Sequence, residues 1–135
     1  MEPKTILDTD ILSALMRRTP VVLNRARNYS ADHSKLTLSL ITRYEILRGL
    51  KAKNATTQIA SFNVFCANNE VLPITEQIIV RASDIYADLH RRGQLIGDAD
   101  ILIASTAIEY GLVLATNNVA HFGRIAGLQI DNWLT

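Results

Sequence analysis

The sequence is poor in cysteine, and this limits both its chemistry and its surroundings. Cys66 is the only cysteine among the 135 residues, so neither an intrachain disulfide nor a zinc cluster of thiolates can form. This absence favours a reducing compartment. Cys66 lies beside phenylalanines in an apolar, helix-like segment, and we predict that it is a core residue and not a reactive thiol.

Long hydrophobic runs and targeting signals are also missing. No apolar run approaches the roughly 20 residues that a membrane-spanning helix requires. Residues 1–4 (MEPK) show no signal-peptide pattern, so we expect a cytoplasmic protein without membrane contact. A content of 48% hydrophobic and 20% charged residues excludes a disordered chain and predicts one globular domain over residues 1–135.

Several motifs of common enzyme classes are absent. The sequence has no glycine-rich phosphate loop, no Gly-x-Ser-x-Gly nucleophile elbow and no cysteine-based catalytic motif. His33, His90 and His121 do not have the spacing of metal ligands. These absences argue against nucleophilic catalysis and leave hydrolysis by a metal-activated water.

The net charge of +1 is small, but the charges are unevenly distributed along the chain. Residues 1–54 carry ten Lys and Arg against five Asp and Glu, whereas residues 55–135 carry four against eight. Helices in the basic half could hold a polyanion beside an acidic site. Each arginine taken alone fits an ordinary solvated surface equally well.

Short β-like runs alternate with amphipathic helix-like segments, which is typical of a parallel α/β sheet. We predict a three-layer α/β/α sandwich with a mainly parallel sheet of four to five strands. The predicted strands are 4–7, 36–39, 71–74, 112–115 and an edge strand at 128–130. The predicted helices are 9–17, 20–29, 42–50, 55–67, 75–93, 99–110 and the short 119–122.

Polar residues ahead of these helices predict where the helices begin. We expect Thr9 or Asp10 to cap the first helix, and Thr75 and Asp98 to cap two later ones. Residues 42–45 read Thr-x-x-Glu, which predicts a capping box between the first and the last of them.

Four acidic residues, Asp8, Glu45, Asp98 and Asp100, lie where a strand or a turn meets a helix. Such junctions gather at the carboxyl edge of a parallel sheet, where ligands bind. Converging carboxylates repel one another unless a cation lies between them, and hard oxygen ligands suit Mg²⁺ or Mn²⁺. The acids therefore predict a metal-dependent enzyme that acts on a phosphate ester.

Neutral polar residues accompany the acids at the same junctions. Asn118 follows the strand over 112–115 and is either a turn residue or a ligand of a hard cation or its water. Thr9 or Thr116 is expected to hold the Asp8 carboxylate through a hydroxyl group.

Four segments share their pattern with one known family, in the family's order. They are residues 6–12 (ILDTDIL), 39–49 (SLITRYEILRG), 96–104 (IGDADILIA) and 114–118 (LATNN), and residues 127–133 (GLQIDNW) add a fifth likeness. Together they resemble PIN-domain ribonucleases of the VapC toxin type over essentially the whole chain. Each motif alone is weakly specific, whereas four in order at the right intervals are strong.

The resemblance implies the roles of particular residues. It makes Asp8, Glu45 and Asp100 the ligands of Mg²⁺ or Mn²⁺, with Asp98 as a helper, and it overrides capping as the role of Glu45. Asn118 stands where the wider family often has an aspartate, which weakens a second metal site. The candidates for phosphate contact are Arg17, Arg18, Arg43 and Arg48.

The resemblance also implies partners and a substrate. Toxins of this type are held inactive by a cognate VapB antitoxin, commonly form homodimers, and reach promoter DNA through the antitoxin. The expected substrate is RNA. Similar members cut initiator tRNA in its anticodon loop, so this tRNA is the expected target.

Two alternatives stand beside this hypothesis. A strand followed by Asp8-Thr9-Asp10 is similar to the start of haloacid-dehalogenase-type phosphatases, in which the first Asp is the nucleophile. Ile11 and Leu12 stand where that family usually has Gly-Thr or a similar pair. The second alternative is a non-catalytic PIN-like module that binds RNA or protein without cutting, against which the full set of acids argues.

Overall fold

The computed structural model describes residues 1–135 as an alternation of strands and helices. The strands are β1 (Thr5–Leu7), β2 (Thr37–Ser39), β3 (Glu70–Leu72), β4 (Val113–Ala115) and β5 (Ile130–Asp131). The helices are α1 (Thr9–Met16), α2 (Pro20–Ser30), α3 (Leu40–Ala52), α4 (Thr56–Asn68), α5 (Glu76–Arg91), α6 (Asp98–Glu109) and α7 (Val119–Phe122). Every predicted element is present, and its boundaries lie close to the predicted ones.

The five strands form one sheet in the order β3-β2-β1-β4-β5, and every pair is parallel. The chain runs outward from β1 to β2 and β3, and then returns through α5 and α6 to β4 on the other side of β1. The connection that follows β1 therefore leads to β2, towards one edge of the sheet, and the connection that follows β4 leads to β5, towards the opposite edge. Such a switch point opens a crevice at the carboxyl ends of the two strands, where α/β proteins bind ligands.

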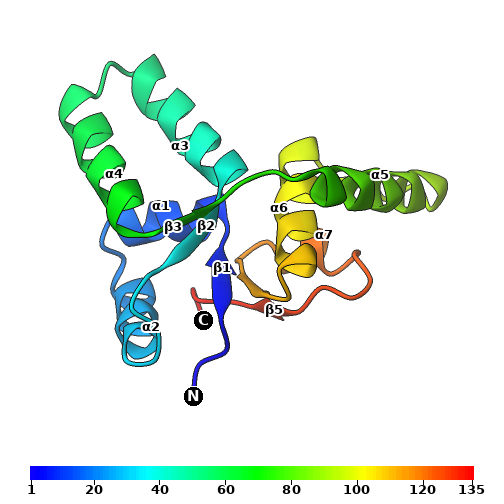
Figure 1. Cartoon of the computed structure of the whole chain (residues 1–135), viewed down its shortest axis with the longest axis horizontal. Coiled ribbons are helices and arrows are strands. Elements are labelled where there is room, and N and C mark those ends of the chain that lie inside the picture. Colours follow the sequence, from blue (N-terminus) through cyan, green and yellow to red (C-terminus); the bar gives the residue numbers. More distant parts are fainter.

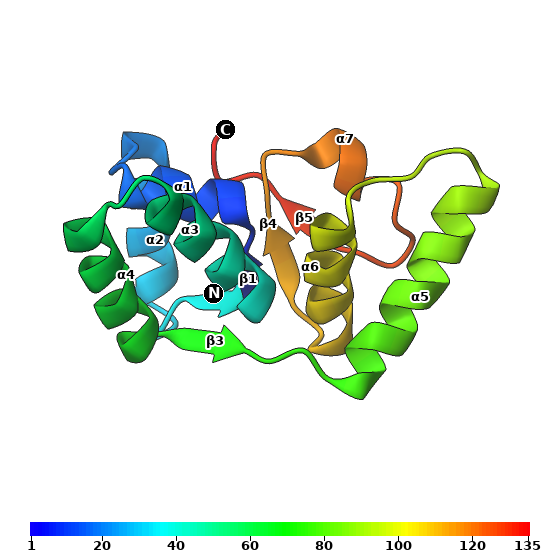
Figure 2. The same ribbon diagram turned by 90° about the horizontal axis from the view of Figure 1, so that it is seen from above.

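Alternate residues of the central strands face two separate hydrophobic cores. Ile6 and Leu114 belong to the core shared with α5, α6 and α7, whereas Leu7 and Ala115 belong to the core shared with α1 to α4. Figures 1 and 2 show these two groups of helices on either side of the sheet. The predicted three-layer sandwich is confirmed, and Cys66 is buried in the second core as predicted.

The C-terminal segment closes the second core. Trp133 is fully buried there, 5.8 Å from the Tyr29 ring between centroids. The Arg25 guanidinium lies 5.6 Å from the Trp133 ring and forms an ion pair with Asp131. The segment that resembles the ends of bacterial VapC proteins thus anchors the last strand to α2.

The cap of α1 differs from the predicted one. Asp8, not Thr9 or Asp10, precedes the helix in an extended conformation, and its Oδ1 accepts the Ile11 N–H at 2.8 Å. One oxygen of this carboxylate therefore stabilises the start of α1, a structural role that the sequence did not indicate. The predicted cap at Thr75 is confirmed.

Two further helix starts correct the predictions. Ser39 Oγ accepts the Thr42 N–H at 3.0 Å, so the cap of α3 lies three residues earlier than the capping-box pattern predicts. Glu45 consequently lies beyond the first turn and is free to point at other elements. At α6 the cap position is Gly97, and Asp98 is the first helical residue.

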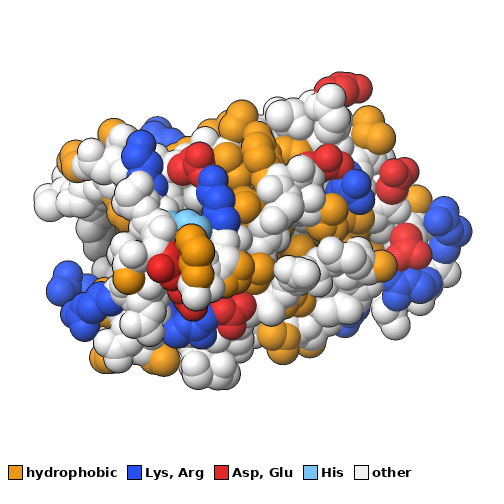
Figure 3. Space-filling model, turned by 60° about the horizontal axis from the view of Figure 1, so that its bottom comes forward, with side chains coloured by type: hydrophobic (Ala, Val, Ile, Leu, Met, Phe, Trp, Pro, Cys, Tyr) orange, Lys and Arg blue, Asp and Glu red, His pale blue; other side chains and the backbone are white.

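The uneven charge of the sequence becomes a spatial separation in the fold. Helices α1 to α4 lie together on one side of β1, and α5 to α7 lie on the other (Figure 1). On the face in Figure 3, Lys and Arg side chains lie singly or in small groups between acidic and hydrophobic ones, so that face has no continuous basic surface.

None of the helices has the length and apolar character needed to cross a bilayer.

Candidate functional site

The acids Asp8, Glu45 and Asp100 approach one another from three different elements. Asp8 lies between β1 and α1, Glu45 in the second turn of α3, and Asp100 in the first turn of α6. The three residues lie near the carboxyl edge of the sheet beside the switch point, close enough for the charge of Asp100 to act on Asp8 and that of Glu45 to act on Asp100.

Asp8 is only 4% exposed. Burial raises the pKa of its carboxyl from 3.8 to about 6; the Thr116 hydroxyl and the Ile11 N–H lower this pKa, and the charges of Asp10 and Asp100 raise it further. Thr116 is itself fully buried. Of the two threonines predicted to hold Asp8, Thr116 is the one whose hydroxyl acts on it.

Asp100 shares this electrostatic environment. Burial raises the pKa of its carboxyl, the charge of Glu45 raises it further, His121 lowers it, and Asp10 adds a smaller increase. Asp10 thus acts on both Asp8 and Asp100, a role that its predicted place at the helix cap did not indicate.

A chain of hydroxyl groups holds Glu45. Thr9 Oγ1 lies 2.6 Å from Glu45 Oε1 and 3.1 Å from Thr42 Oγ1, which lies 3.3 Å from Ser39 Oγ. Because an ionised carboxylate only accepts hydrogen bonds, Thr9 donates to Glu45, Thr42 to Thr9 and Ser39 to Thr42. Ser39 and Thr42 are fully buried. Thr9 therefore orients Glu45 and not Asp8, and the sequence analysis missed the two residues behind it.

Asn118 and His121 border the site on the side of Asp100. Asn118 Nδ2 lies 2.9 Å from His121 Nδ1, and the Asn118 N–H donates to Thr116 Oγ1 at 2.9 Å. His121 Nδ1 is 3.9 Å from Asp100 Oδ2, too far for a hydrogen bond.

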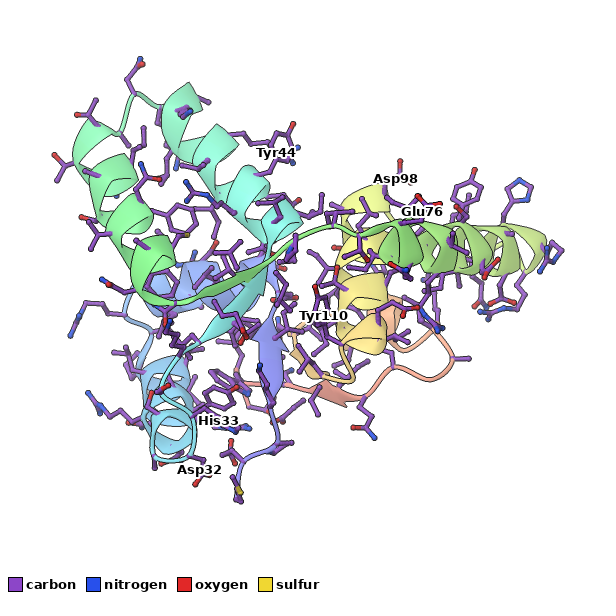
Figure 4. The ribbon with its side chains drawn as sticks, in the orientation of Figure 1. Asp32, His33, Tyr44, Glu76, Asp98 and Tyr110 are labelled. Carbon is purple, nitrogen blue, oxygen red and sulfur yellow. The ribbon has the colours of Figure 1, made fainter.

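Asp98 lies apart from these acids. It is exposed and lines a shallow hollow with residues of α5 and α6, such as Tyr86 and Leu102. Figure 4 labels its side chain at the start of α6. The structure thus does not bring the predicted helper into the cluster.

Arg48 is the predicted phosphate contact that lies directly beside the site. Its guanidinium is 3.6 Å from Glu45 Oε2 and 5.1 Å from the Tyr44 ring. The Arg48 side chain is 58% exposed, so its ion pair with Glu45 is screened by water and easily exchanged.

The other three arginines occupy different settings. Arg43 donates to Asn63 Oδ1 at 3.0 Å and lies 5.7 Å from the Phe62 ring, so it joins α3 to α4. Arg17 lines a groove next to the site. Arg18 is exposed in a left-handed turn with a φ of 61°.

The donor set suits a hard divalent cation. Neighbouring carboxylates raise one another's pKa values because their negative charges repel, and a bound cation would reduce this repulsion. All of the donor atoms are oxygens, which are the ligands that hard divalent cations prefer. As the side chains stand, no three His, Cys, Asp or Glu residues are close enough to surround an ion. The oxygen donors therefore fit a divalent metal by their chemistry, and the structure does not show them arranged around one.

Comparison with known proteins places this chain in a family. Residues 5–128 match the PIN domain family. Ribonuclease VapC2 of Haemophilus influenzae is 32% identical over 133 residues, which cover 97% of this chain and 98% of that protein. The tRNA(fMet)-specific endonuclease VapC of Salmonella typhimurium is 31% identical over 131 residues, or 96% of this chain and 98% of that protein.

A structural relative agrees with the sequence comparison. The crystal structure of DNA-bound VapBC from Salmonella typhimurium contains a chain that superposes with a TM-score of 0.85 at 30% identity, over 98% of this chain and 99% of that one. This agreement argues against the haloacid-dehalogenase-type alternative. The chain therefore belongs to the PIN-domain family and, within it, to the VapC ribonucleases.

Proposed function

We propose that this chain is the toxin of a toxin–antitoxin pair and cuts RNA internally with Mg²⁺ or Mn²⁺ held by Asp8, Glu45 and Asp100. One observation carries this proposal: three acids from distant parts of the chain, with Asp10, converge at the switch point of the sheet. A fold alone does not establish an activity. Here, however, acids are present at the positions expected from the family pattern, and the charges of Asp100 and Glu45 act on their acidic neighbours.

The residues of the chain divide the chemical work among them. A bound divalent ion supplies Lewis acidity and lowers the pKa of a water molecule. Asp8 would hold such an ion through its carboxylate, one oxygen of which, Oδ1, also accepts the Ile11 N–H. Hydrolysis would join the water oxygen to phosphorus and break the bond from phosphorus to the leaving ribose oxygen, with one water proton passing to the solvent and the leaving oxygen taking up a proton. Arg48, beside Glu45, is placed to meet the negative charge on the phosphate.

The proposed substrate is initiator tRNA, cut in its anticodon loop. The support is a relative named for tRNA(fMet), which is 31% identical over nearly the whole chain. The specificity of such an enzyme resides in surface residues that position the RNA, so the substrate is a narrower proposal than the ribonuclease activity itself.

The proposed partner is a VapB-type antitoxin. The structural relative was crystallised as a DNA-bound VapBC complex, which supports a protein partner for this chain and a link to promoter DNA through that partner. We further propose a homodimer within the complex, as in the family.

Cleavage of purified initiator tRNA tests the activity and the substrate together. Protein freed of antitoxin should make one cut in the anticodon loop with Mg²⁺ or Mn²⁺ and none with EDTA. Metal-dependent cutting of other RNAs would retain the ribonuclease and reject the tRNA. If correctly folded protein cuts no RNA under any of these conditions, the non-catalytic binding module becomes the better hypothesis.

The hydroxyl chain behind Glu45 makes a separate prediction. Thr9→Val removes the donor to Glu45 and is expected to lower kcat/KM for RNA by about 10–100-fold, as is usual for groups that orient metal ligands. Thr9→Ser keeps the hydroxyl and should retain most of the activity. Titration with Mn²⁺, followed by calorimetry, should show weaker binding only for Thr9→Val; equal losses in both variants would assign Thr9 a packing role.

A further inference from the structure

A groove of about 720 Å³ runs between α1, α3 and α4, and the catalytic cluster uses only one end of it. Thr9 and Glu45 line the groove, so it is continuous with the site. Phe65 supplies aromatic surface from α4, and Gln58 and Ser61 supply polar groups. The walls thus combine apolar, polar and charged surface.

The two walls of the groove that α1 and α3 form begin at the catalytic cluster, and each ends at a positively charged side chain. Thr9 and Arg17 stand eight residues apart along α1, and Glu45 and Lys53 stand eight residues apart along α3. Eight helical residues correspond to about 12 Å. Arg17 and Lys53 both line the groove, and neither forms an ion pair in the structure.

Gly49 keeps the middle of the groove open. It lies between Glu45 and Lys53 at a spacing of four residues, which places all three on one face of α3. A Cβ atom built on Gly49 would meet no atom within 4 Å. The glycine is therefore not required by packing inside the protein, and the space above it is available to a ligand.

We propose that this groove holds the RNA strand on one side of the cut, with Arg17 and Lys53 contacting its phosphates and Phe65 offering a face for a base. Unpaired cations beside an aromatic surface suit a ligand that combines negative charge with flat rings. The groove also lies in the basic half of the molecule, among α1 to α4 (Figure 1). This inference rests on the proposed ribonuclease function and assigns it a path for the substrate.

Salt dependence of binding tests the phosphate contacts. Binding of a labelled anticodon stem–loop of initiator tRNA would be measured without metal at several salt concentrations. Arg17→Ala and Lys53→Ala should each reduce the slope of log K against log [salt] by about 0.7, the value for one phosphate contact with a single strand. Lys51→Ala is the matched control, because it removes the same charge near the same end of α3 but does not line the groove.

Substitution at Gly49 tests the path itself. Gly49→Leu should raise KM for RNA at least tenfold with a smaller change in kcat, whereas Gly49→Ala, which adds one methyl group, should have little effect. Gly49→Ala should melt no lower than the wild type, because a Cβ atom at this position would meet no atom within 4 Å, and the melting temperature of Gly49→Leu is measured beside it. A matching melting temperature excludes misfolding as the cause of a raised KM.

The outcomes separate this inference from the proposed function. Cutting by the wild type and by Lys51→Ala establishes the ribonuclease. If Arg17→Ala, Lys53→Ala and Gly49→Leu then bind and cut RNA as the wild type does, the groove does not carry the substrate and the inference is overturned. If the wild type itself neither binds nor cuts RNA, the ribonuclease proposal and the inference fail together.

Discussion

Replacing Asp8 with Asn is expected to reduce RNA cleavage by roughly 10³-fold or more while leaving the fold intact. The carboxylate is the most deeply buried acid of the cluster, and an amide cannot supply the negative charge that a divalent ion requires. A metal ion is worth several kcal/mol of transition-state stabilisation, and about 1.4 kcal/mol corresponds to a factor of ten. Single-turnover cleavage with saturating Mg²⁺ measures the loss.

The hydrogen bond by which Asp8 caps α1 provides the folding control for Asp8→Asn. The amide introduced by Asp8→Asn retains an oxygen that can accept the Ile11 N–H, so the start of α1 should be preserved and the circular dichroism spectrum unchanged. Asp98→Asn is the matched control. Asp98 lies outside the cluster, so this variant should cut RNA at close to the wild-type rate. Cleavage by Asp8→Asn within tenfold of the wild type would remove Asp8 from the metal site.

Stability should fall as pH rises in the metal-free protein, by about 2 kcal/mol between pH 4 and pH 7 from Asp8 alone. Burial raises the pKa of Asp8 from 3.8 to about 6, so between these values the folded state binds more protons than the unfolded state. The free energy of unfolding then decreases with rising pH, and the loss is complete above the folded-state pKa. The raised pKa of Asp100 acts in the same direction.

Comparison with Asp8→Asn isolates this effect from the other titrating groups. The variant should match the wild type near pH 4 and be about 2 kcal/mol more stable at pH 7, because a neutral amide removes the buried charge. Trp133 is the only tryptophan and is fully buried, so its fluorescence follows urea unfolding. Millimolar Mg²⁺ should stabilise the wild type and not the variant; equal stability of the two proteins at pH 4 and pH 7 would contradict the buried-charge account.

The order and type of the elements followed from local patterns in the chain. Hydrophobic periodicity and alternation predicted every strand and helix, because each pattern reports which face of its own segment is buried. The acids Asp8, Glu45 and Asp100 were likewise identified from their places in motifs. Their meeting followed from a general rule, since the carboxyl ends of parallel strands share one edge of the sheet.

The caps show where local patterns failed. Thr42 satisfies a capping-box pattern, yet Ser39 starts the helix because its hydroxyl is already placed at the end of β2 to accept the Thr42 N–H. The same shift turns Thr42 into a link between Ser39 and Thr9. A pattern of residue types cannot distinguish two nearby hydroxyls that compete for one helix start.

By itself, the sequence determined the secondary structure, the parallel α/β class and the identity of the acids, because these depend on residue types and spacings within short segments. Only the tertiary structure decided which side chains meet. It placed Asp10 beside the cluster and Asp98 outside it, aimed Thr9 at Glu45, and opened the groove over Gly49. These outcomes depend on how helices far apart in the chain are rotated and packed against one another, which no local spacing encodes.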